Sequence, residues 1–265
     1  MLKVTDLTKT FDTIVAVDAV SLDIARGEMI AIIGPSGAGK STLLRLINRL
    51  VTPSSGTIVC ENADVTALSG RKVRAWRSQC AMIFQQFGLV KRSDVITNVL
   101  LGRLNAKPSW QTIPGIFTRG ERAEALALLA RFGVEALALQ RADTLSGGQQ
   151  QRVGIAKALL QKPDIILADE PIASLDPKSS LQVMEALRTV NREDGLTVVC
   201  NLHNVQMARD FCDRIVAMRD GRTVYDGPPD GLSPNQVREV YGMNPEHDDD
   251  TPQAATVAKR AMART

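Results

Sequence analysis

Hydrophobic and polar positions alternate along the first third of the chain, and many of the apolar positions hold β-branched residues. This alternation predicts strands over residues 1–7, 13–24 and 28–33, with further strand signals at 56–60 and 80–84. The third segment contains the run MIAII, which is apolar at every position, as expected of a strand that is buried on both faces. We therefore expect this strand at the centre of a sheet.

Helical periodicity begins immediately after these first strands. The segment KSTLLRLINRL, residues 40–50, carries its leucines and isoleucine at helical spacing, and Pro53 closes it. From 87 to 144 helical patterns dominate, in VITNVLLGRL and ERAEALALLARFG, with the insert AKPSWQTIPGIF between them. A further helix is expected over 146–161. These patterns predict a mostly helical subdomain at about residues 87–162, inserted into the rest of the fold.

Strands and helices alternate in the remainder of the chain. Helices are expected at 178–192 and 205–212, and strands at 164–169, 197–202, 214–221 and 222–227. Such alternation favours a largely parallel sheet covered by helices, so the predicted fold class is α/β. The domain is expected to span residues 1–243. The polar segment 244–265 is predicted to be a disordered tail, and a short amphipathic helix at 254–263 is the alternative.

Composition narrows the function classes. The chain has 265 residues, of which 44% are hydrophobic and 23% charged, as in an ordinary soluble domain. The net charge is only +3, and the chain has no basic block and few aromatic residues, so no nucleic-acid partner is expected. The N-terminus lacks the apolar run of a signal peptide, and no window approaches the roughly 18 apolar residues of a membrane helix. We therefore expect a cytoplasmic protein that serves any membrane from its surface.

The cysteines and histidines are not spaced as metal ligands. No two cysteines form a CxxC pair, and the two histidines add no zinc pattern. Buried free thiols in a reducing compartment are favoured over a metal site or disulfides. The residues concerned are Cys60, Cys80, Cys200, Cys212, His203 and His247.

The segment GPSGAGKS matches the phosphate-binding pattern G-x-x-x-x-G-K-[ST] in full, between an apolar strand and a helix. Its glycines allow backbone N–H groups to turn toward phosphate oxygens, and the helix N-terminus adds positive potential. Lys40 is placed to reach the β- and γ-phosphates, and Ser41 to offer its hydroxyl to Mg²⁺. The predicted nucleotide-binding residues of this segment are Gly34, Pro35, Ser36, Gly37, Ala38, Gly39, Lys40, Ser41 and Thr42.

Two carboxylates, Asp169 and Glu170, end the apolar run IILADE. In α/β folds, ligands bind where parallel strands end. Asp169 suits a metal shell, directly or through water, and Glu170 beside a γ-phosphate would polarise the attacking water. The alternative is a solvated strand end without a ligand.

The segment LSGGQQQR begins the helix expected after residue 145. Ser146 can cap that helix, but capping alone does not explain two destabilising glycines at its start. A helix N-terminus with open backbone is an anion site. Because the chain already holds one complete phosphate loop, we predict that this second site completes a nucleotide bound by another copy. Its residues are Ser146, Gly147, Gly148 and Gln149.

Taken in order, six segments resemble the motifs of an ABC transporter ATP-binding subunit: GPSGAGKS, MIFQQF, LSGGQQQR, IILADE, SLD and NLHNV. The resemblance covers about residues 1–243. It implies a P-loop NTPase (ABC ATPase) α/β core with an antiparallel β subdomain and an inserted helical subdomain. It also implies ATP hydrolysis with Mg²⁺, and a head-to-tail dimer that sandwiches two ATP molecules.

The implied partners follow from the same resemblance. They are a second copy of the chain, integral membrane permease subunits and, indirectly, a periplasmic or surface substrate-binding protein. The implied location is the cytoplasmic face of the inner cell membrane, where the chain would be peripheral.

The resemblance further assigns roles to single residues. Gln85 is similar to the residue that senses Mg²⁺ and the attacking water, and His203 to the switch histidine at the γ-phosphate. The implied catalytic set is Glu170, His203 and Gln85, and the implied metal set is Ser41, Gln85 and Asp169.

Two more residues receive roles in the same way. Phe11 lies where the family places an aromatic side chain against adenine, and the alternative is a core phenylalanine beside Val15 and Val17. Asp176, in the SLD motif, would help to join the two copies.

The cargo is suggested by segments outside the shared motifs. INRLV, TNVLLGRL, GIFTRGERAEAL and GRTVYDGPP are similar to the phosphonate-import branch of the family, which implies uptake of phosphonate or a related phosphorus oxyanion. The alternatives are another transport cargo (phosphate, amino acid or lipoprotein export), a soluble ABC ATPase and a non-enzymatic regulator. A single phosphate loop and no long coiled coil disfavour the soluble ATPase, and intact Glu170 and His203 disfavour the regulator.

Overall fold

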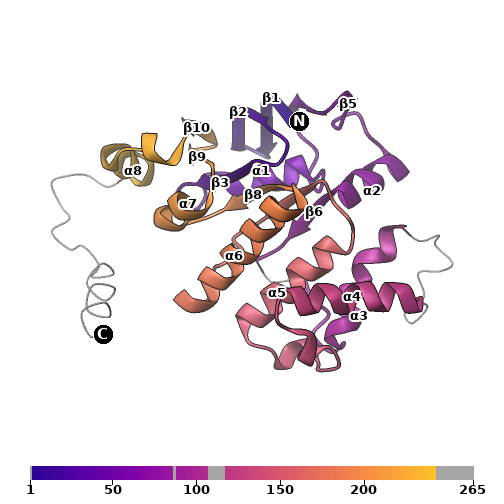
Figure 1. The fold of residues 1–265 in the computed structure, drawn as a ribbon. Helices are drawn as coiled ribbons and strands as arrows, with labels where there is room; N and C mark the ends of the chain where they lie inside the picture. Colours follow the sequence, from indigo (N-terminus) through magenta and orange to yellow (C-terminus); the bar gives the residue numbers. More distant parts are fainter. Residues whose placement is uncertain (1, 86–87, 107–116, 243–265) are drawn as a thin grey trace, which may run out of the picture.

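The computed structural model describes residues 2–85, 88–106 and 117–242 (Figure 1). The predicted tail 244–265, the alternative helix at 254–263 and most of the insert AKPSWQTIPGIF lie outside the described residues. Figure 1 shows the helices α3, α4 and α5 grouped at one end, and the strands β1, β2 and β5 above the central sheet.

The strands form two sheets. The first has four antiparallel strands in the order β2-β1-β4-β5, and the second has six in the order β10-β9-β3-β8-β7-β6. The strands are β1 (Leu2–Phe11), β2 (Ile14–Ile24), β3 (Met29–Ile33), β4 (Ser55–Cys60), β5 (Ala63–Asp64), β6 (Cys80–Ile83), β7 (Ile165–Ala168), β8 (Thr197–Asn201), β9 (Arg214–Arg219) and β10 (Arg222–Gly227).

Helices pack on the second sheet and also form a separate group at one end of the molecule. The α-helices are α1 (Lys40–Ile47), α2 (Gly70–Gln79), α3 (Val95–Leu100), α4 (Arg119–Arg131), α5 (Gly147–Leu159), α6 (Pro177–Asp194), α7 (Val205–Phe211) and α8 (Pro234–Tyr241). The short 3₁₀ helices are η1 (Leu101–Ala106), η3 (Glu135–Leu137), η4 (Ala142–Thr144) and η5 (Pro229–Gly231).

The six-stranded sheet is largely parallel, as the alternation of strands and helices predicted. Strands β3, β6, β7, β8 and β9 run parallel, and only β10 is antiparallel, paired with β9 at one edge. All five residues of β3 are buried, which confirms that the MIAII run lies inside the sheet. Both neighbours of β3 also have buried centres, so the strand that leads into the phosphate loop is held on all sides.

Alternate residues of β3 belong to two different cores. Met29 and Ala31 pack in a cluster with residues of α5, α6 and the helical end of the molecule. Ile30 and Ile32 pack in a second cluster with α1 and the antiparallel sheet. The period of two residues along a strand therefore places one layer on each face of the sheet.

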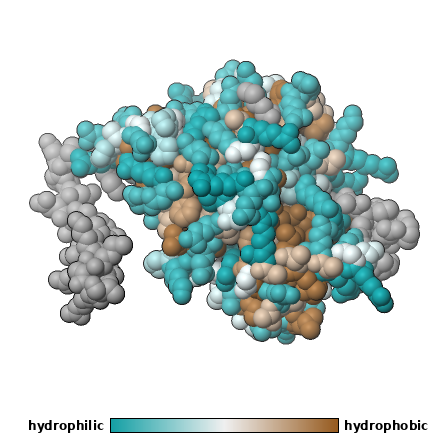
Figure 2. Space-filling view, viewed as in Figure 1, coloured by the Kyte–Doolittle hydropathy of each residue, from teal (hydrophilic) through white to brown (hydrophobic). Residues whose placement is uncertain are grey.

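The helical end is built from α3, α4 and α5, which pack on one another. Its helices are capped: Asp94 accepts from the backbone N–H of Thr97 at the start of α3, and Thr118 and Glu121 form a capping box at the start of α4. Figure 2 shows a mostly hydrophilic surface with apolar residues gathered toward this end. The bounds 87–162 stay a prediction.

Several element bounds differ from the sequence-based expectation. The helix expected over 40–50 ends at Ile47, because Arg49 takes a positive φ of 63° and Leu50 is 42% exposed rather than on the buried face. Helix α2 was not predicted, because Trp76 is its one buried residue and leaves no apolar period. Helix α8 was also missed, although the capping residues Ser233 and Gln236 signal its start.

Candidate functional site

Four neighbouring strands bring most of the predicted site residues to one edge of the central sheet. Strands β3, β8, β7 and β6 are adjacent and parallel, so their carboxyl ends meet at the same edge. Gly34 follows β3, His203 comes two residues after β8, Asp169 follows β7 and Gln85 comes two residues after β6. The order of strands thus gathers segments that lie far apart in the sequence, at the edge where α/β folds bind ligands.

The phosphate loop is clamped between β2 and β9. A Cβ atom on Gly34 would lie 2.1 Å from the carbonyl oxygen of Met218, and one on Gly39 would lie 2.2 Å from that of Ala16. Both glycines also have positive φ angles, 147° and 96°, which side-chain-bearing residues rarely adopt. The loop leads directly into α1, at whose N-terminus backbone N–H groups and the helix dipole favour a phosphate.

The Lys40 ammonium lies inside this loop. Its Nζ donates hydrogen bonds to the carbonyl oxygens of Gly34 (2.8 Å) and Pro35 (2.9 Å), and the residue is only 4% exposed. Burial lowers the pKa of Lys40 from its ordinary value, and the carboxylates of Glu170 and Asp169 oppose that shift. A cation is therefore held between the loop and the two acidic residues, where it favours a polyanionic ligand.

Asp169 is fixed in place by polar contacts. Its Oδ1 accepts hydrogen bonds from the Ser41 hydroxyl (2.7 Å) and from the Asn201 amide (2.8 Å). The guanidinium of Arg45 lies 3.6 Å from the other carboxylate oxygen. Because the Asp169 side chain is 5% exposed, these contacts satisfy the hydrogen-bonding capacity of a buried carboxylate and orient it.

Asn201 was not among the residues predicted from sequence. It ends β8 and is fully buried, and its Oδ1 has no hydrogen-bond partner in the described part of the chain. A polar residue in the otherwise apolar run TVVCNL, two positions before His203, is a signal that could have pointed to it. An unpaired acceptor beside Asp169 indicates that this site has capacity for a further polar partner.

Glu170 and His203 form a side-chain pair. The Nε2 atom of His203 lies 2.8 Å from Oε1 of Glu170, with the carboxylate side chain 19% exposed and the imidazole 42% exposed. Glu170 has a positive φ of 52°, an uncommon backbone conformation for a residue with a side chain. The sequence named both residues separately, and the structure joins them across 33 positions.

Gln85 belongs to the same edge but not to this hydrogen-bonded cluster. With Arg45 and Asp169 it lines a groove of about 1010 Å³, which Leu89 and Gln150 also line. Its segment is tied to α5 by Lys157, whose Nζ donates to the carbonyl oxygen of Gly88 at 2.6 Å. Burial lowers the pKa of Lys157. The helix that starts at the LSGGQQQR segment is thus hydrogen-bonded to Gly88, three positions after Gln85 in the sequence.

The LSGGQQQR segment caps α5. The Ser146 hydroxyl accepts from the backbone N–H of Gln149, and the Gln149 side chain accepts from the backbone N–H of Ser146. Gly148 is buried against α6, where a Cβ atom would lie 2.8 Å from both Cβ and Oγ of Ser179. Packing inside one copy therefore accounts for one of the glycines that capping did not explain. Ser146 itself is exposed.

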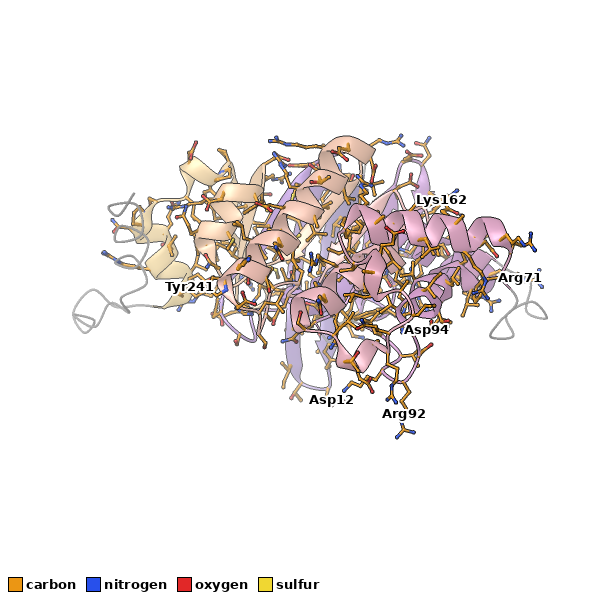
Figure 3. The ribbon with its side chains drawn as sticks, turned by 60° about the horizontal axis from the view of Figure 1, so that its bottom comes forward. Asp12, Arg71, Arg92, Asp94, Lys162 and Tyr241 are labelled. Carbon is orange, nitrogen blue, oxygen red and sulfur yellow. The ribbon has the colours of Figure 1, made fainter. Side chains whose placement is uncertain are left out.

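The aromatic side chain of Phe11 is exposed, not part of the core. It ends β1 and is 44% exposed, next to Ile14 and Val15, which are 69% and 47% exposed. Figure 3 shows the neighbouring Asp12 at the tip of the β1–β2 hairpin, projecting from the body of the molecule. The alternative of a core phenylalanine is therefore wrong. The Lys9 ammonium lies over the ring, 4.9 Å from its centroid.

Asp176 has a local role. Its Oδ1 accepts from the backbone N–H of Ser179 and caps α6. Hydrogen bonds from Ser179 hold the pKa of Asp176 below its usual value. The carboxylate is exposed, and the predicted contact with a second copy stays a prediction.

The described residues contain neither a metal-binding cluster of His, Cys, Asp or Glu nor a membrane-spanning helix. Over 2–85, 88–106 and 117–242, no group of three His, Cys, Asp or Glu side chains gathers as a metal cage. Within the same ranges, no helix has the length and apolar character needed to cross a bilayer. All four cysteines are free, and burial raises the pKa of Cys212 to about 12, so that thiol stays protonated at neutral pH.

Comparison with known proteins gives consistent matches. A family model described as ABC transporter matches residues 17–173. The chain is 56% identical to the phosphonates import ATP-binding protein PhnC of Rhizobium etli over 92% of this chain and 87% of that protein. It is 54% identical to the protein of the same name from Bradyrhizobium diazoefficiens over 92% and 90%.

Solved structures match the whole fold. The ATP-binding cassette MJ0796, in a dimeric post-hydrolysis state bound to ADP and Pi, matches with a TM-score of 0.76 and 36% identity, over 86% of this chain and 99% of that chain. The protein cbiO1 from Clostridium perfringens, part of the ABC transporter complex cbiONQ, matches with a TM-score of 0.77 and 30% identity, over 90% and 92%. The predicted P-loop NTPase architecture is confirmed.

Proposed function

The chain belongs to the ABC transporter family of ATP-binding proteins, and we propose that it hydrolyses ATP to drive uptake of phosphonate or a related phosphorus oxyanion. The observation that carries the proposal is the cluster at one sheet edge: the Lys40 ammonium inside its glycine loop, the buried Asp169 and the Glu170–His203 pair. The similarity to proteins named for phosphonate import supports the cargo.

The residues at this edge fit a triphosphate. The loop 34–39 and the N-terminus of α1 suit phosphate oxygens, and Lys40 supplies a cation among them. Phe11 and Thr42 complete the proposed set, one against the base and the other near the α- and β-phosphates. The exposed ring of Phe11 can stack without unpacking a core.

The same residues fit Mg²⁺. Hard oxygen ligands suit this ion, which keeps several waters and is bound through one or two protein oxygens plus phosphates. The Ser41 hydroxyl and the Asp169 carboxylate are already in contact, and Gln85 lines the same groove. When bound, Mg²⁺ would neutralise charge on the phosphates. We propose Ser41, Asp169 and Gln85 as its protein contacts.

Glu170 and His203 supply the chemistry of water attack in this proposal. Glu170 would accept the proton of the attacking water, and the imidazole, 2.8 Å away, would hold that carboxylate and reach the γ-phosphate. The positive φ of Glu170 and the end of β7 fix the direction of its side chain.

A second copy completes the pocket in this proposal. Ser146, Gly147, Gly148 and Gln149 begin α5, which offers a helix N-terminus that the chain's own loop does not use. The likeness to a dimeric cassette bound to ADP and Pi supports a head-to-tail pair, with Asp176 near the join. Ser146 is exposed, so it is available to a partner.

The remaining partners are membrane proteins. We propose that permease subunits receive the motion of the helical end, and that a periplasmic or surface binding protein delivers the cargo to them. The chain would act at the cytoplasmic face of the membrane.

Hydrolysis is tested by Glu170→Gln, with Glu185→Gln on the exposed face of α6 as the matched control. We expect Glu170→Gln to bind ATP with near-normal affinity and to lose roughly 10²–10⁴-fold in kcat, which is the usual worth of a general base. The control should keep its rate. A Glu170→Gln variant with near-normal hydrolysis would refute the assignment of the base.

Cargo is tested in cells that lack this chain. Uptake of a labelled phosphonate should return with the wild-type chain and not with Glu170→Gln. Restored lipoprotein release or amino-acid uptake, with phosphonate uptake still absent, would favour the corresponding alternative cargo.

A further inference from the structure

The C-terminal helix α8 is firmly attached to the central sheet. Val240 is 3% exposed and packs in the same core as β3 and β9. At the end of the helix, the guanidinium of Arg219 on β9 donates to the carbonyl oxygen of Glu239 at 2.6 Å. The last residue of the helix, Tyr241, precedes a glycine in the left-handed conformation, Gly242. The position of Tyr241 is therefore set by the packing of α8 on the core.

The hydroxyl of Tyr241 joins two loops of the candidate site. It donates to the carbonyl oxygen of His203 at 3.3 Å, and its oxygen accepts from the backbone N–H of Gly34, the first residue of the phosphate loop. Burial raises the pKa of Tyr241, so the phenol stays protonated and able to donate at neutral pH. Figure 3 shows Tyr241 at the end of α8, where that helix meets the body of the molecule.

The loop that carries His203 has few other anchors. Its preceding residue Leu202 donates to the carbonyl oxygen of Ile32, and Asn204 caps the short helix α7. The His203 side chain itself is 42% exposed, so packing alone does not fix its direction. A contact on the backbone of His203 therefore bears directly on where the imidazole points.

We propose that Tyr241 is a positioning residue for hydrolysis: from α8 it holds the backbone of His203, so that the imidazole stays against Glu170 beside the phosphate loop. The inference rests on the proposed function, because it takes His203 and Glu170 as the hydrolytic pair. It gives α8 a role in the rate of the reaction, through the contact between its last residue and the His203 backbone.

The test removes one oxygen atom. Tyr241→Phe keeps the ring in the core and deletes the hydroxyl, and the matched control is Tyr225→Phe, which deletes a hydroxyl that donates to the carbonyl oxygen of Pro228 at 2.6 Å. These are the two tyrosines of the chain. The His203 contact is longer than a typical hydroxyl hydrogen bond, so we expect a loss of about two- to fivefold in kcat for Tyr241→Phe. The KM for ATP and the Tm should match those of the control.

The deciding measurement is the kcat of Tyr241→Phe combined with His203→Ala. In the His203→Ala background, Tyr241→Phe should lose most of its effect on kcat, because the residue that it positions is gone and only the contact with Gly34 remains. A wild-type kcat for Tyr241→Phe, or an equal loss in both backgrounds, would overturn the inference. If His203→Ala itself hydrolyses ATP at a near-normal rate, the proposed function of that residue fails instead, and the two failures are told apart.

Discussion

Replacing Gly148 by alanine is the sharpest test of how the LSGGQQQR segment is built. The added Cβ atom would lie 2.8 Å from Cβ and Oγ of Ser179 on α6, closer than carbon atoms in proteins approach. Helix α5 and helix α6 would have to separate by several tenths of an ångström, or Ser179 would have to turn away. The change therefore perturbs contacts within one copy, whatever the segment binds.

The expected magnitude follows from two opposing effects. Overpacking of this kind costs about 1–3 kcal/mol, whereas replacing glycine by alanine in a helix gains at most about 1 kcal/mol. The net destabilisation is about 1 kcal/mol, which lowers Tm by about 2–4 °C in a domain of this size. Gly120 is the matched control, since it holds the same second position in α4 and its Cβ would meet nothing closer than 3.9 Å. Gly120→Ala should leave Tm unchanged or raise it.

Thermal unfolding of Gly148→Ala, Ser179→Gly and the double variant completes the assay. Ser179→Gly removes both crowded atoms, so the double variant should recover most of the lost Tm. The reasoning is refuted if Gly148→Ala raises Tm as Gly120→Ala does, or if Ser179→Gly gives no recovery.

Further expectations concern the loop, the base and the pH dependence. Lys40→Ala should abolish detectable ATP binding in a calorimetric titration, because it removes the cation between the loop carbonyls and the two carboxylates; binding within tenfold of wild type would contradict this. Phe11→Ala should raise the Kd for ATP by about two- to tenfold, the worth of one aromatic contact, whereas Ile14→Ala on the same hairpin should not. Hydrogen bonds from Arg188 hold the pKa of Asp213 below its usual 3.8. The ionised carboxylate therefore stabilises the folded protein above pH 3.8, and this stabilisation is lost as the pH falls through the pKa of the folded state. In urea unfolding, Asp213→Asn should therefore have a lower free energy of unfolding than wild type at pH 7, and this difference should shrink as the pH falls below about 3.8. A difference in unfolding free energy that does not change with pH would contradict the linkage.

The sequence indicated which polar residues lie at the ends of strands where the pattern is local. Each of three motifs places polar residues at the end of a strand: GPSGAGKS, IILADE and NLHNV. The order of the strands in the sheet brings those ends together. Contacts between distant segments carried no sequence signal. The pairs Gly148–Ser179 and Tyr241–His203 depend on how layers pack, which periodicity does not specify.

Helix bounds show the same limit. Leu50 fits the helical period of α1, yet the chain turns at Arg49 because Asn48 donates to the carbonyl oxygen of Cys80 and Trp76 donates to that of Ile47. Side chains from elsewhere in the fold thus end the helix. The local pattern contains neither partner.

The central claim is that a working pocket needs residues from two copies. The direct measurement is sedimentation velocity of Glu170→Gln with ATP, alone and combined with Ser146→Arg. The account predicts a dimer that holds two ATP molecules for Glu170→Gln, and a monomer that still binds ATP for the double variant. A Ser146→Arg double variant that dimerises as tightly, or a wild-type monomer that hydrolyses ATP at the full rate per chain, would contradict it.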